Sequence, residues 1–352
     1  MSSTVLDENI LMIRDLKVNF YTYEGVVKAL DGINLYIKKG EILGLVGETG
    51  CGKTVTVRSI MRLIESPGKI TGGEIIYNNR DILKMSEDEV RNLRGSKIGM
   101  IFQDPMTFLN PVLKVGHQVA EMLMLHQDFP EAKIEGTNKY DQKILKKVLK
   151  EKVIDIFKQV RLADSENIYE RYPHELSGGM RQRILISMAI ASRPDLIIAD
   201  EATTSLDVTI QAQILELLTL LRKELQKTLI IVTHNLGIVA EMCDRVCVLY
   251  GGQVAEVTPV SELFSNPIHP YTQGLIRSIP LLHKPVDQLS SIEGVVPNLV
   301  TPPSGCRFHP RCELAEDKCK QERPQLVTLE NGHMFACYVK ERDFKDQIVA
   351  RV

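Results

Sequence analysis

The fold is decided by one stretch of the chain, Gly47-Glu48-Thr49-Gly50-Cys51-Gly52-Lys53-Thr54. Its spacing, Gly-x-x-x-x-Gly-Lys-Thr, is that of a phosphate-binding loop, in which glycines let the backbone turn its N–H groups inward onto an anion. Residues 42–46 are apolar and predict a strand before the loop, and residues 55–63 predict a helix after it, whose positive end adds to the attraction. We expect Lys53 to contact the β- and γ-phosphates of a nucleotide and Thr54 to place its hydroxyl on Mg²⁺.

Two adjacent acids, Asp200 and Glu201, end a second apolar run at residues 196–199. We assign Mg²⁺ to Asp200, usually through water, and the general base that polarises the attacking water to Glu201. Two acids after a strand can also merely cap a helix. The phosphate-binding loop upstream favours the hydrolytic interpretation.

A second anion-binding nest is expected at Ser177, Gly178 and Gly179, which precede a helix that opens with basic residues. One ATP needs a single phosphate-binding loop, so this second element predicts a site completed by another subunit, although a Ser-Gly-Gly sequence can also be a plain helix cap. The sequence Leu-Ser-Gly-Gly, followed closely by Gln-Arg and later by the strand that ends in Asp-Glu, resembles the signature of ATP-binding cassette (ABC) transporter ATPases.

This resemblance covers about residues 10–257 and assigns further roles. Gln103 resembles the loop glutamine that reaches Mg²⁺ and the attacking water and senses the membrane partner. Ser205-Leu206-Asp207 resembles the loop that crosses the dimer interface, and His234 resembles the switch histidine that contacts the γ-phosphate. The resemblance implies that two cassettes pack head to tail around ATP, and that hydrolysis lets them open.

The resemblance also implies that an aromatic side chain upstream of the loop stacks on adenine. Phe20, Tyr21 and Tyr23 compete for this role, and Tyr23 is favoured by its distance from the loop. The full set of expected nucleotide-binding residues is Tyr23, Gly47, Glu48, Thr49, Gly50, Cys51, Gly52, Lys53, Thr54, Val55, Ser177, Gly178, Gly179 and Asp207.

The fold class implied is an α/β, P-loop, ABC-type nucleotide-binding domain. It comprises a RecA-like core with a mixed or parallel sheet, an antiparallel β subdomain and a helical subdomain at about residues 105–185. Short apolar runs that alternate with helical patterns agree with a sheet covered on both faces. Beyond residue 257 proline becomes frequent and strand signals fade. We therefore place a boundary there and expect residues 258–352 to form a small extension with little core of its own.

The extension carries two segments that resemble the oligopeptide and dipeptide importer branch of the family. One is Pro-Ile-His-Pro-Tyr-Thr at residues 267–272, and the other is the cysteine-rich residues 305–312. Nickel and glutathione importers share them, so an importer for either is an alternative. A soluble cassette ATPase of the DNA-repair or translation type is another, but such proteins usually carry two cassettes or a long coiled-coil insertion, and neither is visible here.

Four of the seven cysteines lie near the end of the chain with the spacing C-x5-C-x6-C-x17-C, at Cys306, Cys312, Cys319 and Cys337. Four thiolates suit a structural zinc or an iron–sulfur cluster. Because zinc ribbons favour paired C-x2–4-C knuckles, we favour a [4Fe-4S] cluster over Zn²⁺, which the resemblance also implies. Four reduced cysteines packed as small apolar residues are the third interpretation. His309 is expected to be a bystander, whereas alkylation of Cys51 is expected to block ATP binding.

Composition limits the remaining possibilities. With 44% hydrophobic residues, 25% charged residues and a net charge of -2, the chain is expected to be globular and to have no bulk attraction to nucleic acid. No run of eighteen apolar residues occurs, so we expect a chain that stays in the cytosol. The resemblance implies that it is peripheral, on the cytoplasmic face of the cell membrane. The resemblance implies a second ABC ATPase subunit (a heterodimer is favoured over a homodimer), two transmembrane permease subunits and, indirectly, an extracytoplasmic substrate-binding protein.

Overall fold

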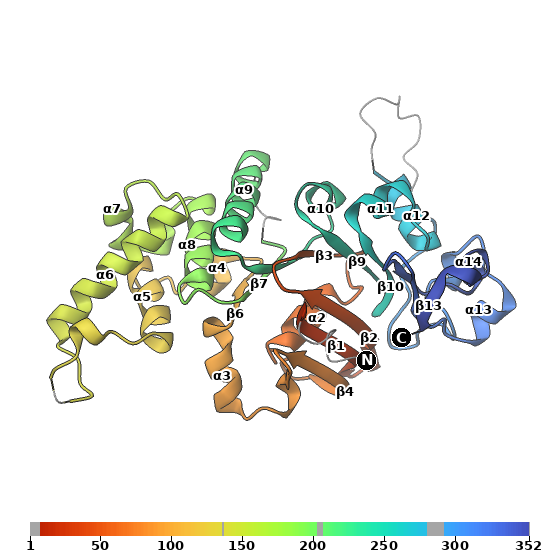
Figure 1. Ribbon diagram of the computed structural model, residues 1–352, viewed down its shortest axis with the longest axis horizontal. Coiled ribbons are helices and arrows are strands. Elements are labelled where there is room, and N and C mark those ends of the chain that lie inside the picture. Colours follow the sequence, from red (N-terminus) through yellow and green to blue (C-terminus); the bar gives the residue numbers. More distant parts are fainter. Residues whose placement is uncertain (1–7, 136, 203–206, 280–291, 352) are drawn as a thin grey trace. The chain divides into compact units, whose positions relative to one another are not determined.

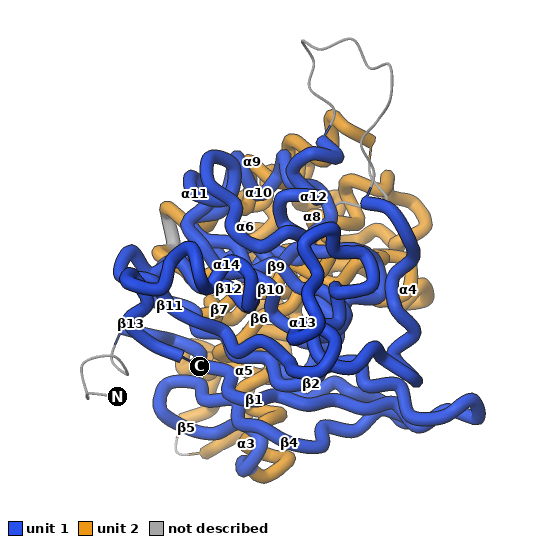
Figure 2. Tube along the Cα trace, turned by 90° about the vertical axis from the view of Figure 1, so that its right-hand side faces the viewer, with its two compact units in different colours: residues 1–85, 230–352 blue, residues 86–229 orange. Residues whose placement is uncertain are grey.

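The computed structural model describes residues 8–135, 137–202, 207–279 and 292–351. Its chain divides into two compact units, which Figure 2 shows in different colours. The first unit combines Met1–Met85 with Ile230–Val352, and the second unit is Ser86–Leu229.

An antiparallel sheet in the first unit contains the long strands β1 (Asn9–Thr22), β2 (Gly25–Lys38) and β4 (Gly68–Tyr77) and the short β5 (Arg80–Asp81). The strand order is β2-β1-β4-β5. β1 and β2 form a hairpin whose pairing ends at Thr22 and Gly25, so Tyr23 lies in its turn. Leu11, Leu16 and Val18 are buried along β1.

A second sheet of the first unit contains the strand that leads into the phosphate-binding loop, β3 (Ile42–Val46). β3 lies between β8 (Thr228–Val232) and the parallel β9 (Arg245–Tyr250), and all three strands are buried along their whole length. Burial on both faces explains why each of them is a continuous apolar run in the sequence. β9 then pairs with the antiparallel β10 (Gln253–Pro259).

The α-helices of the first unit are labelled in Figure 1, and three short 3₁₀ helices accompany them in the described residues. They are α2 (Lys53–Ile60), η1 (Ile82–Lys84), α10 (Leu236–Met242), α11 (Val260–Ser265), α12 (Pro270–Arg277), η4 (His309–Arg311), α13 (Asp317–Gln321), α14 (Tyr338–Asp343) and η5 (Lys345–Gln347).

In the second unit, β6 (Ile98–Ile101) and β7 (Leu196–Asp200) pair in parallel. Its helices are α3 (Glu87–Ser96), α4 (Pro105–Phe108), α5 (Val115–His126), η2 (Pro130–Ala132), α6 (Gln142–Gln159), α7 (Ser165–Tyr169), η3 (Pro173–Glu175), α8 (Gly178–Ile190) and α9 (Val208–Leu225). Local chemistry fixes several helix starts: Ser86 and Glu89 form a capping box on α3, and Asp141 caps α6.

The chain beyond residue 257 has more structure than the sequence predicts. β11 (Val327–Leu329), β12 (Met334–Phe335) and β13 (Ile348–Arg351) continue the sheet from β10 in the order β10-β12-β11-β13. A hydrophobic cluster of its own holds this part together, made of Ile268, Val327, Leu329, Phe335 and Cys337. The expectation of little core and few strands beyond residue 257 is therefore wrong. The sequence gives no sign of these strands, because strands of two to four residues are too short to produce a periodic signal.

A fully buried carboxylate joins β10 to this cluster. Glu256 accepts hydrogen bonds from the backbone N–H groups of Ile268 at 2.9 Å and His269 at 2.8 Å, and lies 2.6 Å from Nε2 of His333. Burial is the largest influence and pushes the pKa of Glu256 up, but the contact with His333 and the other hydrogen bonds to the carboxylate together outweigh it, so the pKa lies below its usual value. The start of the extension is thus anchored at a defined position on the sheet.

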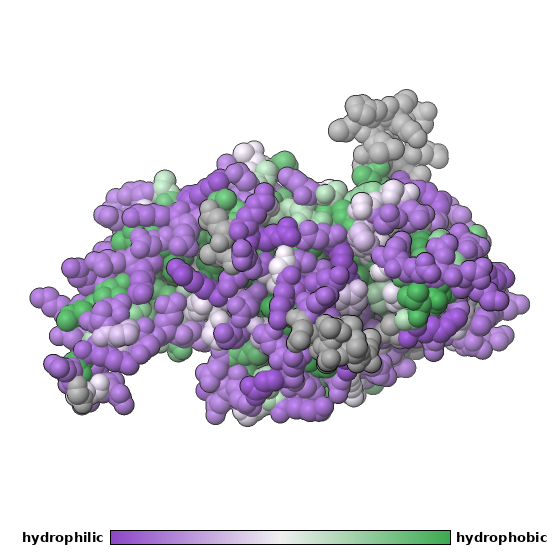
Figure 3. All heavy atoms as spheres, in the orientation of Figure 1, coloured by the Kyte–Doolittle hydropathy of each residue, from purple (hydrophilic) through white to green (hydrophobic). Residues whose placement is uncertain are grey.

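No helix in the described parts of the chain combines the length and apolar character needed to cross a bilayer. Hydrophilic side chains predominate on the face shown in Figure 3, and the hydrophobic areas between them are small. In the second unit, exposed large hydrophobic side chains concentrate on α4 and just after it, at Met106, Phe108, Val112 and Leu113.

Replacing Phe335 by alanine should lower the free energy of unfolding of the first unit by about 3 to 5 kcal/mol, because the ring is fully buried and a cavity would remain. Urea unfolding followed by circular dichroism measures the change. Val349→Ala is the control, since this side chain is 61% exposed and should have little effect. Equal unfolding midpoints for the two variants would contradict a packed core in the extension.

Candidate nucleotide-binding site

Three glycines give the phosphate-binding loop its path between β3 and α2. Gly47, Gly50 and Gly52 have φ angles of 147°, 80° and 104°, in the region that side chains disfavour. A Cβ atom at Gly47 would lie 2.2 Å from the carbonyl oxygen of Leu249, and one at Gly52 would lie 2.6 Å from Leu30. At Gly50 the same position is open space. The loop is thus closed on the protein side and open on the other, which fits a cradle for phosphate groups.

Lys53 begins α2 and is 5% exposed. Its ammonium donates hydrogen bonds to the carbonyl oxygens of Gly47 at 2.8 Å and Glu48 at 3.2 Å. Thr54 is the second residue of α2 and Val55 the third. The expected phosphate-binding and Mg²⁺-binding groups therefore lie at the start of the helix, as the motif predicts.

Cys51 points away from solvent within this loop. Its side chain is 1% exposed, and burial raises the pKa of the thiol although the charge of Lys53 partly offsets that effect. Because the thiolate is the reactive form, alkylation requires the loop to open. The expected block of ATP binding by alkylation stays a prediction.

Two further residues of the first unit remain assigned by resemblance alone. Tyr23 is fully exposed in the β1–β2 turn, so its ring is accessible to a ligand from solvent. His234 lies two residues after the end of β8 and is exposed, and Asn235 caps α10 by accepting from the N–H of Gly237 at 2.8 Å. Adenine stacking by Tyr23 and γ-phosphate contact by His234 stay predictions.

The expected base and the expected loop glutamine meet in the second unit. Nε2 of Gln103 donates a hydrogen bond to Oε2 of Glu201 at 3.0 Å, although the two residues lie 98 positions apart in the sequence. Glu201 has a φ angle of 46°, which is uncommon for a residue with a side chain. Asp200, the last residue of β7, is 2% exposed. Within this unit, the structure therefore places Gln103 beside the expected general base, which directly follows Asp200.

The Ser-Gly-Gly element forms the start of α8. Ser177 is the N-cap, and its hydroxyl accepts from the N–H of Met180 at 3.3 Å. Ser177 and Gly178 are exposed, whereas Gly179 is buried, and a Cβ atom there would lie 2.8 Å from Ile210. Asp207 caps α9 by accepting from Ile210 N–H at 2.9 Å, while Ser205 and Leu206 lie outside the described residues. The helix start is accessible to a ligand from outside the unit.

The four late cysteines converge. Cys306, Cys312, Cys319 and Cys337 line one small cavity in the first unit, and all four are free thiols. Burial raises the pKa of Cys306 to about 12. This donor set fits a group held by four thiolates. In the described part of the chain, however, no three His, Cys, Asp or Glu side chains stand at metal-binding geometry.

His309 lines the same cavity but is otherwise engaged. Its Nδ1 lies 2.9 Å from the carbonyl oxygen of Cys306, so the ring is tied to the backbone of the cysteine segment. This contact agrees with its expected role as a bystander.

Two residues that hold the loop carry no local sequence signal. Arg311 pairs with the carboxylate of Glu48, and the hydroxyl of Tyr271 accepts from the Glu48 N–H. Tyr271 lies in a segment that the importer resemblance singles out, but its contact with the loop is not implied by any spacing.

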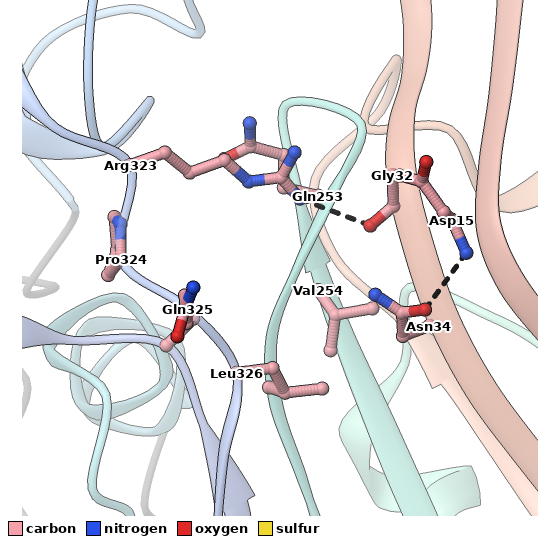
Figure 4. Close-up of a pocket in the computed structure, with 10 residues that line it drawn as sticks. Asp15, Gly32, Asn34, Gln253, Val254, Arg323, Pro324, Gln325 and Leu326 are labelled. Carbon is pink, nitrogen blue, oxygen red and sulfur yellow. Dashed lines mark hydrogen bonds between the residues drawn. The ribbon is translucent and has the colours of Figure 1, made fainter. Parts of the chain in front are cut away.

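A separate polar groove of about 510 Å³ lies elsewhere in the first unit. Figure 4 shows that Arg323 extends across it towards β2, where its guanidinium donates to the carbonyl oxygen of Gly32 at 3.1 Å. Asp15 and Asn34 line the opposite side. None of the expected site residues lines this groove.

Comparison with known families gives two separate matches. Residues 30–204 match the family described as ABC transporter, and residues 255–319 match the family described as oligopeptide/dipeptide transporter, C-terminal region.

Curated relatives match along nearly the whole chain. A probable peptide ABC transporter ATP-binding protein of Sinorhizobium fredii is 44% identical over 96% of this chain and 97% of its own length. An oligopeptide transport ATP-binding protein of Bacillus subtilis is 42% identical over 96% of this chain and 99% of its own. A dipeptide transport ATP-binding protein of Escherichia coli is 42% identical, with coverages of 94% and 96%.

Solved structures share the fold. A dimeric ATP-binding cassette in a post-hydrolysis state with ADP and phosphate aligns with a TM-score of 0.61 and 27% identity, over 71% of this chain and 98% of that one. A component of an ABC transporter complex from Clostridium perfringens aligns with a TM-score of 0.59 and 29% identity, over 74% and 92%.

Replacing Glu201 by glutamine should lower the rate of ATP hydrolysis by roughly 100-fold or more, because a general base contributes about that factor or more. Binding of ATP should stay within about twofold, since the amide keeps the shape of the side chain. Phosphate release and the fluorescence of a labelled ATP analogue measure the two effects. Glu216→Gln on the exposed face of α9 is the matched control. Hydrolysis at the normal rate in Glu201→Gln would exclude Glu201 as the base.

Proposed function

The chain belongs to the family of ABC transporter ATP-binding proteins, and from this membership we propose that it hydrolyses ATP to drive the import of dipeptides or oligopeptides. The observation that carries the substrate class is the match of residues 255–319 to the C-terminal region of oligopeptide/dipeptide transporters. Relatives named for peptide, oligopeptide or dipeptide transport cover the same full length. Import of nickel or glutathione is the alternative within the branch.

We propose that the phosphate-binding loop holds ATP and that Gln103, Asp200 and Glu201 act in its hydrolysis, as the family resemblance implies. The backbone of the loop cradles the phosphates, Lys53 neutralises their charge, and Thr54 and Asp200 hold Mg²⁺. The ion supplies positive charge that stabilises the phosphate oxygens. Glu201 accepts a proton from the attacking water, and the hydrogen bond from Gln103 fixes the direction of its carboxylate.

We propose that two cassettes share each ATP. The exposed N-terminus of α8, with Ser177 and Gly178, presents an anion-binding nest to the nucleotide of a partner cassette. The dimeric arrangement of a similar cassette with 27% identity supports this proposal. The partner is a second ABC ATPase subunit, and we propose a heterodimer over a homodimer, as the family resemblance implies.

We propose that the chain acts at the cytoplasmic face of the cell membrane, bound to two transmembrane permease subunits that receive substrate from an extracytoplasmic binding protein. The exposed apolar residues just after Gln103, Met106 and Phe108 on α4 and Val112 and Leu113 beyond it, form the contact. Exposed apolar side chains this close together favour a protein interface over solvent. Their position next to Gln103 connects the interface to the residue that touches Glu201.

We also propose that Cys306, Cys312, Cys319 and Cys337 hold a [4Fe-4S] cluster, with Zn²⁺ as the alternative. The shared cavity and the absence of disulfides among them support a common ligand. Such a group would stabilise the extension by linking three separate segments of chain.

Cells in which this chain is replaced by its Glu201→Gln variant should lose uptake of a radiolabelled dipeptide or tetrapeptide to background, because the transporter cannot turn over. Uptake of ⁶³Ni²⁺ and labelled glutathione should be unchanged. Loss of nickel or glutathione uptake with normal peptide uptake would reject the peptide assignment.

Purification through a tag on this chain should recover two permeases and a different ATPase chain. Recovery without any membrane protein would reject the transporter assignment.

Anaerobic purification should give a brown protein with broad absorption near 400 nm, and Cys312→Ser should remove both colour and iron. Cys243→Ser is the matched control, because Cys243 is a buried cysteine outside the cavity. Iron and zinc are measured by elemental analysis of the same samples. A colourless protein with stoichiometric zinc would favour Zn²⁺ over the cluster. A metal-free protein would reject both proposals.

A further inference from the structure

We propose that Arg311 is a positioning residue for ATP binding, which holds the phosphate-binding loop in place through Glu48. Arg311 lies in the cysteine-rich segment of the extension, 263 positions away from Glu48. Both residues belong to the first unit. The inference goes beyond the proposed transport function, because it assigns part of nucleotide binding to the extension.

The side chains of the pair meet in a two-pronged contact. The two terminal nitrogens of Arg311 lie 2.6 Å and 3.0 Å from the two carboxylate oxygens of Glu48. The Arg311 side chain is 5% exposed and the Glu48 side chain 26%. A paired guanidinium and carboxylate with this geometry and little solvent is directional and strong.

The guanidinium is itself fixed by other groups. It donates to the carbonyl oxygens of Ile292 at 3.1 Å and Glu293 at 2.9 Å, and to the hydroxyl of Tyr250 at 3.3 Å. With these contacts each nitrogen of the guanidinium has at least one partner. Arg311 therefore acts as a fixed point from which the position of Glu48 is set.

The backbone of Glu48 is held by the extension as well. Its N–H donates to the hydroxyl of Tyr271 at 2.9 Å. The ring of Tyr271 is fully buried and packs against Tyr250 and Phe308, with centroid distances of 4.6 Å and 5.4 Å. Glu48 is thus gripped at both its side chain and its main chain.

Glu48 in turn contacts the phosphate-binding groups. Its carbonyl oxygen accepts from the N–H of Cys51 at 3.2 Å and from the ammonium of Lys53 at 3.2 Å. A shift of Glu48 therefore moves the turn that aims the loop N–H groups and the cation that contacts phosphate. Removing Arg311 leaves a partly buried carboxylate unpaired inside the loop, which favours such a shift.

The experiment measures ATP affinity in Arg311→Gln, Arg311→Lys, Glu48→Gln and the double variant Glu48→Gln/Arg311→Gln of the full chain. Each glutamine variant should weaken binding of a fluorescent ATP analogue by about tenfold, which corresponds to about 1.4 kcal/mol. The double variant should be no weaker than either single one, because the two residues act as a pair. Arg311→Lys should recover part of the loss, since an ammonium keeps the charge but not the two-pronged geometry.

Arg323→Gln is the matched control. Arg323 also ties the extension to the rest of the unit, through Gly32, but it does not touch the loop. In the assembled transporter, Arg311→Gln should raise the KM for ATP about tenfold while kcat falls by less than about twofold. This pattern is expected when binding of the ground state and the transition state is weakened equally. Thermal unfolding of every variant separates a general loss of stability from this effect.

The inference is overturned if Arg311→Gln binds ATP normally, if the losses in the double variant add, or if Arg323→Gln weakens binding as much. Loss of peptide transport with unchanged ATP affinity in Arg311→Gln also overturns it. The result is independent of the substrate assignment, because binding of the nucleotide analogue is measured without transport.

Discussion

The backbone N–H groups that a phosphate-binding loop aims at an anion cannot also stabilise the shape of the loop. Its glycines at 47, 50 and 52 also carry φ angles that cost conformational entropy to fix. The shape must therefore be imposed from outside. β3 and α2 hold the two ends, while Arg311 and Tyr271 hold the middle at Glu48. The extension thereby takes part in a constraint that the motif alone cannot meet.

Buried ion pairs link the extension to the rest of the first unit. Arg307 is 3% exposed and donates to the carbonyl oxygens of Lys28 and Gly251 and, at 3.0 Å, to the carboxylate of Asp31. Arg311 makes the equivalent contact with Glu48 four residues later. Such pairs add little net stability, because both charges lose water. They do disfavour any position of the extension that leaves one of these charges buried and unpaired. They therefore specify how the extension packs.

How much could be predicted from the sequence depends on the distance over which each interaction acts. The loop path and the caps of α8 and α9 follow from residues within a few positions of one another, such as Ser177 with Met180 and Asp207 with Ile210. Residue type and spacing predict the loop and offer a cap at Ser177 as one interpretation, since local hydrogen bonding decides them. Asp207 is expected only as part of the dimer-interface loop that the resemblance implies, and its cap on α9 comes from the structure. The roles of Gln103 and His234 came only from resemblance to a family, because nothing near either residue identifies its chemistry.

The interactions that the sequence did not reveal act over long separations. A glutamate within the loop pattern gives no sign of pairing with an arginine near the other end of the chain. Likewise β11 and β12 contain three and two residues, and only pairing makes them strands: β12 pairs with β10 and β11, and β11 pairs with β12 and β13. Tertiary context decides such elements, so no local propensity predicts them.

In the second unit, too, the expected reactive residue is held in position by a residue far away in the sequence. Glu201 follows its strand in a left-handed conformation, with φ of 46°, which costs free energy and persists only where neighbours hold it. Gln103, 98 positions away, donates the hydrogen bond that orients its carboxylate. The residue that performs each step is thus recognisable from its motif, while the residue that aims it comes from elsewhere in the chain. Variation outside the motifs can therefore change how the protein handles ATP without altering a single motif residue.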